Sequence, residues 1–291
     1  WYYISMIDRI YIPTLGRPNT QITYDSLPEF VKDITYLVVQ PHEASIHKKL
    51  YGKDKVIVLP KSVKGIHNTR KWIYNQAMGS IWGMYDDDLI FLNRDPYNTG
   101  KISGTGHKMN PVDWQIMLET TYAFLNNDKA FAGHRLSFLH PSDNYYRENG
   151  AVHCAYYFNG YKCPYLNWPL PLAEDLYMVI SLLEKGYSNV VWHRYAVDNK
   201  EYSEGGCNTK GLRTINKINK AHKKLAKLYP EFVKIVGKKK NKMGEMDKLR
   251  ISWRKAYESR DKMKKKEHER IIKKLDKLIK EQSKTLAKLP I

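Results

Sequence analysis

The sequence predicts an α/β domain followed by a basic helical extension. Up to about residue 212, short β-rich runs alternate with amphipathic helical runs, which is the pattern of α/β folds. The excess positive charge lies in the remainder: residues 214–291 hold 26 Lys and Arg against 9 Asp and Glu, whereas residues 1–213 hold 23 against 21. We therefore predict two domains, residues 1–212 and residues 213–291, and expect the second to meet a polyanion.

The strands of the first domain are predicted from short apolar runs that end in a turn, a polar loop or a cluster of acids. These runs are RIYIPTL (9–15), ITYLVVQ (34–40), KVIVLP (55–60), IWGMY (81–85) and NVVWHRYAV (189–197). Ligands of open α/β sheets bind beyond the carboxyl ends of the strands. The segments that follow these runs are therefore where a functional site is expected.

Helical spacing of apolar residues predicts three helices between the strands. They cover residues 65–79, 110–127 and 172–187. Asn110 and Pro111 are typical of a helix start, and glycines are typical of the helix ends. Residues 131–168 are rich in aromatic side chains and predict strands and loops, and the polar, glycine-bearing residues 198–211 predict a loop.

The C-terminal part is predicted to be all-helical. Apolar residues recur at helical spacing from Ile215 to Leu228, with lysines between them. From Leu249 to Leu289 they approximate one seam along a cationic helix. Such a seam permits self-association through a coiled coil but does not require it.

Composition limits the class of protein. Three scattered cysteines are too few for a disulfide framework or a four-thiolate zinc site, so a reducing compartment is expected. No run approaches the roughly 18 to 20 apolar residues of a membrane span. The first residues, WYYIS, lack the layout of a signal peptide. We therefore expect a soluble, cytoplasmic protein.

Three adjacent aspartates, Asp86 to Asp88, follow the strand at residues 81–85. Their charges repel one another, and burying them without a counter-charge is costly. Magnesium and manganese bind one or two carboxylates together with substrate phosphates and water. Asp86 and Asp88 are therefore candidates to hold a metal-bound diphosphate, although a solvated acidic turn would show the same residues.

Other candidate residues also have purely structural interpretations. Glu174 and Asp175 open a helix, where the helix dipole favours acids, or one of them is a general base. His193 is either a third metal ligand or a core histidine. Arg17 and Arg70 pair either with phosphates or with nearby acids. The sequence contains no Walker loop, GxGxxG fingerprint, HExxH or CxxC motif that would indicate another chemistry.

The order of these motifs resembles the inverting GT-A glycosyltransferases of the family 2 type. The motifs are IPTLGRP, VVQPHE, GIHNTRKWIYNQA, YDDDLIFL and AEDLYM, over roughly residues 8–210. Arg70 matches the arginine of that family's Ala-Arg-Asn helix, whereas Lys71 replaces the asparagine. The IPTLGRP start, the GGC loop and the basic extension are most similar to the phage TET-associated glycosyltransferases. The resemblance implies a Rossmann-like mixed sheet flanked by helices.

The resemblance also implies a reaction and a donor site. A sugar would move from a nucleotide-sugar, expected to be a UDP-sugar, with inversion of its anomeric centre and with the help of Mn or Mg. Thr14, Arg17 and Arg70 would line the nucleotide-sugar pocket. Asp86 would contact the nucleotide side and share the metal with Asp88.

Further roles carried over from the family concern the later motifs. His193 would be a possible further metal ligand. Asp175 would be the general base, with Glu174 as its neighbour or alternative. Residues 204–210 would form a lid over the donor, with Lys210 reaching a phosphate, although a solvent-exposed connection is an equally good interpretation.

The implied acceptor is a hydroxymethylated pyrimidine in phage DNA, and double-stranded DNA would account for the basic extension. Phosphate contacts supply most non-specific DNA affinity, and lysines without a base-reading motif predict backbone contacts. Two alternatives stay open. The enzyme could act on a lipid or polysaccharide, with the extension on an anionic membrane surface. The chain could also be a non-enzymatic DNA-binding protein. The sugar and the modified base are not readable from the sequence.

Overall fold

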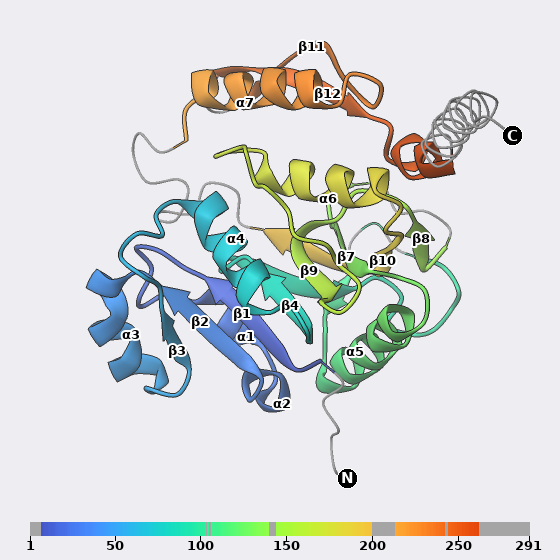
Figure 1. Ribbon diagram of the computed structural model, residues 1–291. Coiled ribbons are helices and arrows are strands. Elements are labelled where there is room, and N and C mark those ends of the chain that lie inside the picture. The colour runs from blue at the N-terminus through green and yellow to red at the C-terminus, as the bar shows by residue number, and fades with distance from the viewer. Residues whose placement is uncertain are drawn as a thin grey trace, which may run out of the picture.

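A large mixed β-sheet forms the centre of the protein in a computed structural model that describes residues 7–102, 104, 106–139, 144–199, 213–241 and 244–261 (Figure 1). The strand order is β3-β2-β1-β4-β9-β7-β10-β5-β6, and β8 pairs with β10 outside this path. The strands are β1 Arg9–Pro13, β2 Thr35–Val39, β3 Val56–Val58, β4 Ile81–Tyr85, β5 Leu89–Asn93, β6 His107–Lys108, β7 Phe131–Leu136, β8 Tyr146–Glu148, β9 His153–Asn159 and β10 Asn189–Asn199.

The pairing of the strands brings several strand ends to one edge of the sheet. Strands β3, β2, β1 and β4 are parallel. Strand β9 is antiparallel to β4 and to β7, and β10 is parallel to β7. The carboxyl ends of β1, β4, β7 and β10 and the start of β9 therefore lie at the same edge, which we call the site edge. The acidic triplet follows β4 at this edge.

Helices cover both faces of the sheet (Figure 1). They are α1 Ile22–Ser26, α2 Glu29–Lys32, the 3-10 helix η1 Pro41–Glu43, α3 Ala44–Tyr51, α4 Ile66–Gln76, α5 Pro111–Asn126 and α6 Glu174–Glu184, whereas α7 Ile215–Leu228 lies beyond α6 and not on the sheet. Helix α5 begins with a reciprocal capping box between Asn110 and Asp113. Helices α4, α5 and α6 correspond to the three that the sequence predicts, and the α/β class is confirmed.

Side chains that alternate along the strands build a hydrophobic core on each face. In β4, Trp82 and Met84 join the core under α4 and α6, whereas Ile81 and Tyr85 join the core that contains Trp114 of α5. Both faces of this strand are buried, as its continuous apolar sequence requires. The sheet is therefore covered on both sides, and polar groups at the site edge are held by a rigid scaffold.

The described part of the extension is not all-helical, so that prediction is wrong. After α7, strands β11 (Val233–Asn241) and β12 (Gly244–Ile251) form an antiparallel hairpin, and a helix covers residues 253–261. Lys238 to Lys240 lie on β11 of this hairpin, in which Gly237 and Gly244 have positive φ angles of 139° and 124°. Most of the predicted apolar seam lies in residues 262–291, outside the described part.

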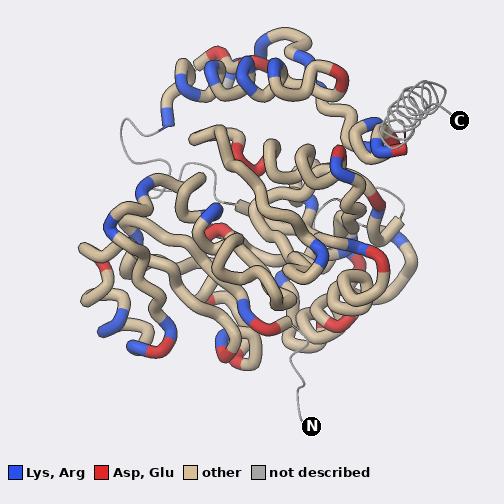
Figure 2. Tube along the Cα trace, in the orientation of Figure 1, with Lys and Arg blue, Asp and Glu red and all other residues tan. Residues whose placement is uncertain are grey.

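The extension packs on α6 and shares its core. Leu225, Tyr229 and Phe232 belong to the same buried cluster as Tyr177 of α6, and the rings of Tyr177 and Tyr229 lie 6.1 Å apart. Figure 2 shows lysines spread along α7 above α6. The predicted domain boundary at residue 212 falls outside the described residues. Among those that are described, no helix is long and apolar enough to cross a membrane.

Candidate active site

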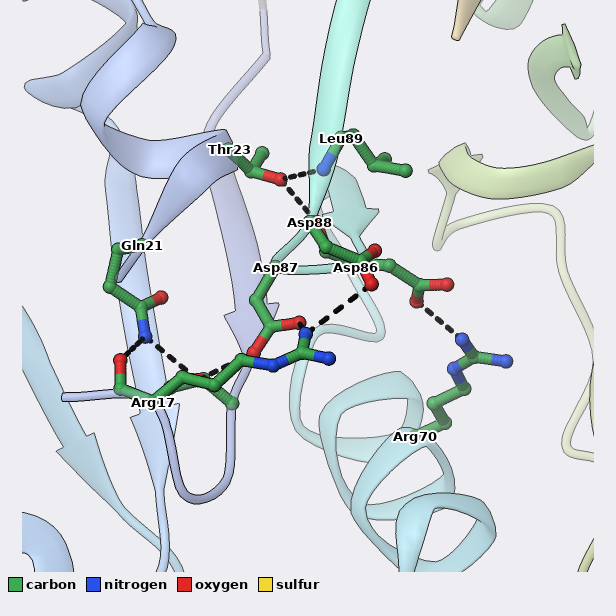
Figure 3. A network of polar contacts seen from close by, with 9 residues as sticks. Arg17, Gln21, Thr23, Arg70, Asp86, Asp87, Asp88 and Leu89 are labelled. Carbon is green, nitrogen blue, oxygen red and sulfur yellow. Dashed lines mark hydrogen bonds and ion pairs between the residues drawn. The ribbon is translucent and has the colours of Figure 1, made fainter. Parts of the chain in front are cut away.

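The acidic triplet forms the tight connection between β4 and β5 at the site edge (Figure 3). Thr23 of α1 holds this connection, because its hydroxyl donates to the backbone oxygen of Asp86 at 2.6 Å and accepts from the Leu89 amide at 2.8 Å. The Asp86 amide donates to the Cys154 carbonyl of β9 at 2.8 Å. The turn is therefore fixed from both sides, which orients its three carboxylates.

Asp87, the middle aspartate, ties the triplet to the loop after β1. It accepts a hydrogen bond from the Thr14 hydroxyl at 2.7 Å and forms a short ion pair with Arg17. The same Arg17 nitrogen lies 3.3 Å from a carboxylate oxygen of Asp88. Burial raises the pKa of Asp87 to about 6, against the opposing effect of Arg17. Asp87 therefore serves as an anchor within the protein.

The loop after β1 is itself fixed by polar contacts. The Gln21 side chain donates to the Thr14 hydroxyl at 2.8 Å and to the Arg17 carbonyl at 2.7 Å. Gly16 has a positive φ of 71°, and its amide donates to a carboxylate oxygen of Glu43 at 2.6 Å. These contacts hold Arg17 against the triplet, so the predicted donor residues Thr14 and Arg17 lie beside the aspartates.

Arg70 of α4 joins the triplet to the start of α6. One guanidinium nitrogen pairs closely with Asp86, and the other lies 2.7 Å from a Glu174 oxygen. Burial disfavours the charge of Arg70, but Asp86 and Glu174 more than offset this, so the pKa of Arg70 is raised. The structure thus brings together Arg70, Asp86 and the acidic pair, which the sequence separates by about a hundred residues.

The two acids at the start of α6 have different surroundings. Glu174 is 6% exposed, and burial raises its pKa to about 7 even with Arg70 opposing the shift. Asp175 is less buried and acts electrostatically on Arg70 and Asp86. Ala173, just before them, has a left-handed backbone conformation with φ 58°, a strained state that recurs at functional sites. Glu174 is thus committed to Arg70, and Asp175 is the better candidate base.

Carboxyl groups outnumber guanidinium groups at the site. The fixed positive charges are the guanidinium groups of Arg17 and Arg70. The acidic groups are those of the triplet, Glu174 and Asp175, so the acids outnumber the fixed positive charges. Burial also raises the pKa of Asp86, and Asp88 adds to this shift. Within the described residues, no group of three His, Cys, Asp or Glu side chains forms a metal site. Asp86 and Asp88 nevertheless offer the two hard oxygen ligands that Mg or Mn needs when phosphates and water complete the shell.

His193 does not join the aspartates. It lies on β10, is 1% exposed, and the charged groups that act on it are Arg135, Arg147 and Arg94. Burial is the main cause that lowers the pKa of His193 to about 4, and these arginines lower it further. The expected metal set of Asp86, Asp88 and His193 is therefore not assembled. Lys210 and the predicted lid at residues 204–210 lie outside the described residues.

The comparison with known proteins places the chain in a family. The sequence model of the TET-associated glycosyltransferases matches residues 9–206. The chain belongs to this family. It is therefore a glycosyltransferase, as its motifs predict, and the match covers the sheet and every described residue of the candidate site.

Two phage proteins are related to this TET-associated glycosyltransferase. Both are named Beta-glucosyl-HMC-alpha-glucosyl-transferase. The protein of Enterobacteria phage T6 is 26% identical over 234 residues, which is 76% of this chain and 80% of the relative. That of Enterobacteria phage T2 is 26% identical over 211 residues, 67% of this chain and 72% of the relative.

Solved structures with a similar arrangement have low sequence identity. S. aureus TarS 1-349 matches with a TM-score of 0.41 and 14% identity, covering 77% of this glycosyltransferase and 72% of TarS. A mycobacterial protein matches with a TM-score of 0.42 and 11% identity, covering 84% and 82% of the two chains.

Several residues of the candidate site are not predicted from the sequence. Asp87 is one, because the motif points to the outer aspartates as ligands. Glu43 and Gln21 carry no motif, and their contacts depend on the loop after β1. His153 and Cys154 open β9 beside the triplet, and burial lowers the pKa of His153 while Asp175 opposes the shift. The polar pair that begins the strand HCAYYFN was the available signal for these two.

Proposed function

We propose that this glycosyltransferase moves a sugar from a nucleotide-sugar, a UDP-sugar, to a hydroxymethylated pyrimidine base in DNA. The observation that carries the proposal is the meeting of the acidic triplet and Asp175 at one sheet edge, in a chain that belongs to the TET-associated family. The names of the two phage relatives support a modified base as the acceptor, since both include HMC.

The donor would lie against the triplet and the loop after β1. Thr14, Arg17 and Arg70 would line its pocket, and Asp86 and Asp88 would hold a divalent cation, Mn or Mg. The cation, when bound, offsets the charge that develops on the departing diphosphate. The excess of carboxylates over guanidinium groups at this edge supports that assignment.

Asp175 would act as the general base. Its carboxylate would remove the proton from the acceptor hydroxyl as that oxygen attacks the anomeric carbon on the face opposite the diphosphate. A single displacement of this kind inverts the anomeric centre. Glu174 would not compete for this role, because it is buried and paired with Arg70. It would instead keep Arg70 in place beside Asp86.

The extension would hold the DNA. Helix α7 carries lysines on its exposed side and no acidic residue, and β11 adds a run of exposed lysines from Lys238 to Lys240. Phosphate contacts of this kind give affinity that falls steeply with salt. On this proposal the enzyme acts in the cytoplasm of the host cell, where phage DNA is present.

The test is transfer from UDP-sugars, with Mn or Mg, to DNA containing cytosine, hydroxymethylcytosine or glucosylated hydroxymethylcytosine, followed by mass spectrometry of the nucleosides. The glucosylated acceptor is included because the relatives' names specify Beta-glucosyl-HMC. A hexose-sized mass increase confined to modified DNA, strongly reduced in Asp88→Asn at the same metal concentration and kept in the control Asp54→Asn, supports the proposal. Asp54 is an exposed carboxylate away from the site.

Two other results would redirect the proposal. Donor turnover without a mark on any DNA would point to a lipid or polysaccharide acceptor. Transfer that is fully active in a chelator would remove the metal from the mechanism. The anomeric configuration of the product, read by NMR against that of the donor, tests inversion directly, and this matters because the relatives' names include the term alpha-glucosyl.

A further inference from the structure

A cluster of cationic side chains lies across β9 from the acidic triplet, outside the donor site. This arginine cluster comprises Arg94, Arg135, Arg147 and His193. Arg135 is on β7 and Arg147 on β8, and both strands pair with β10, which carries His193 (Figure 1). Arg94 follows β5, which also pairs with β10, and its amide donates to the Arg194 carbonyl at 2.8 Å. The pairings of β7, β8 and β5 with β10 therefore bring these groups to one segment of β10.

The cluster has an excess of positive charge. Within the described residues, none of its arginines forms an ion pair with a carboxylate. Two described acids that adjoin these arginines in sequence have other partners: Glu148 pairs with Lys129 at 2.9 Å, and Asp95 accepts from the Tyr145 hydroxyl at 2.6 Å. Gathering like charges without a counter-charge costs free energy, which a bound anion recovers.

The cluster also contains buried donors that the described residues leave without an acceptor. Arg94 is 1% exposed, and its Nη2 donates to the Leu139 carbonyl at 3.0 Å. Its Nε and Nη1, and the Nε of Arg135, are buried with no partner among the described atoms. Buried guanidinium donors are normally satisfied, and their fork geometry matches the oxygens of a phosphate.

The position of the cluster relates it to the acceptor side of the site. His134 precedes Arg135 and pairs across strands with His153 at the start of β9. Burial lowers the pKa of His153, and its charge state responds in opposite directions to Asp175 and Arg135. The triplet follows β4, on the other side of β9 from β7. The cluster and the donor carboxylates therefore lie on opposite sides of β9.

We propose that Arg135 and Arg147, the less buried arginines of the cluster, bind a phosphate of the DNA acceptor next to the nucleotide that receives the sugar. This inference rests on the proposed function, because it assigns the cluster to the same acceptor. Contacts between these arginines and the adjacent phosphate would position the acceptor hydroxyl at Asp175. The extension would supply affinity along the rest of the DNA.

The experiment uses single-site neutralisation of the DNA backbone. Synthetic hydroxymethylated duplexes carry one uncharged methylphosphonate, either 5′ or 3′ to the target nucleotide or several nucleotides away. The ratio of kcat/KM for the all-phosphate duplex to that for each substituted duplex is measured in the wild type, Arg135→Gln, Arg147→Gln and the control Lys49→Gln. Lys49 is an exposed lysine on α3, remote from the cluster. Thermal unfolding of each variant checks that it is folded.

The wild type and the Lys49 control should lose about tenfold in kcat/KM when one adjacent linkage is neutral, the size expected of a charge-assisted hydrogen bond. In Arg135→Gln or Arg147→Gln, kcat/KM on the all-phosphate duplex is already lowered. The ratio falls towards one, because the arginine no longer binds that phosphate. Two outcomes overturn the inference while leaving DNA glycosylation intact: equal ratios at adjacent and distant linkages in the wild type, or an unchanged ratio in both arginine variants. A raised KM for the nucleotide-sugar with an unchanged ratio would assign the cluster to the donor diphosphate. If no wild-type reaction marks DNA, the proposed function itself fails.

Discussion

Replacing Arg70 with glutamine should destabilise the protein in a pH-dependent manner. Arg70 is 6% exposed and joins three elements, because it leaves α4 to pair with Asp86 after β4 and with Glu174 at the start of α6. Removing it leaves Glu174 buried without a counter-charge. Breaking a buried pair by removing one partner costs about 3 to 5 kcal/mol, a large part of a typical unfolding free energy of about 5 to 15 kcal/mol.

The pH dependence follows from the pKa of Glu174, which burial raises from 4.5 to about 7. Between these values the folded protein holds a proton that the unfolded chain has released, so this group lowers stability as the pH rises. Without Arg70, which opposes the shift, the pKa of Glu174 rises further and the loss extends above pH 7. We expect Arg70→Gln to cost about 1 kcal/mol at pH 5, where Glu174 is neutral, and about 3 kcal/mol or more at pH 8.

Urea unfolding of the wild type and Arg70→Gln at pH 5 and pH 8 measures this difference. The control is Arg254→Gln, because Arg254 pairs with Glu258 at 2.7 Å but the two side chains are 80% and 57% exposed. That substitution should cost no more than about 0.5 kcal/mol at either pH. A loss in Arg70→Gln that is the same at both pH values, or below about 1 kcal/mol at pH 8, would refute the role assigned to the buried pair.

Three further predictions concern the proposed chemistry. Asp175→Asn should lower kcat by about 10² to 10⁴ while donor affinity, measured by calorimetry, stays near that of the wild type; a kcat within a few-fold of the wild type would exclude Asp175 as the base. Asp88→Asn should raise the metal concentration needed for half-maximal transfer, and an unchanged metal titration would remove Asp88 from the ligands. Charge reversal at Lys223 and Lys227 of α7 should weaken DNA binding and flatten its dependence on salt, by about one released counterion for each phosphate that the variant no longer neutralises. Fluorescence anisotropy across a salt series measures this slope, and an unaltered slope would place the DNA elsewhere.

The location of the site was predictable because it depends on the order of strands and loops. A buried strand followed by acids, and a helix that opens with two acids, both deliver carboxylates to a sheet edge, and the structure brings Asp86 and Glu174 to the same Arg70. The division of roles was not predictable. Whether Glu174 or Asp175 turns inward depends on the left-handed conformation of Ala173, and nothing in the sequence marks an alanine for that conformation.

The surroundings of His193 depend on an irregularity of β10 that the sequence does not show. The pairing of β10 with β7 shifts between Trp192 and Ala196, so residues in between do not follow simple alternation. Such a shift decides which neighbours a side chain meets, and here they are arginines. The charged groups that act on His193 are therefore arginines and not the aspartates of the triplet.

The hairpin of the extension was missed because lysines report exposure and not secondary structure. The run Val233 to Val236 contains β-branched residues that favour a strand. The surrounding lysines were interpreted as the polar face of a helix, yet the outward face of a two-stranded ribbon has the same composition. Two glycines with positive φ, Gly237 and Gly244, suit a hairpin better than a helix.

Under the proposed function, the packing of the extension on α6 would link DNA binding to the geometry of the candidate active site. Leu225 and Phe232 of the extension lie in the core that also holds Tyr177 and Met178 of α6, and the first turn of α6 carries Asp175. Removing the extension would expose this core face and loosen the helix that positions the candidate base. A deletion would therefore lower activity even on an acceptor that needs no DNA grip. Substitutions on the exposed face of α7 leave this core intact, so they separate the contribution of DNA affinity from that of the scaffold.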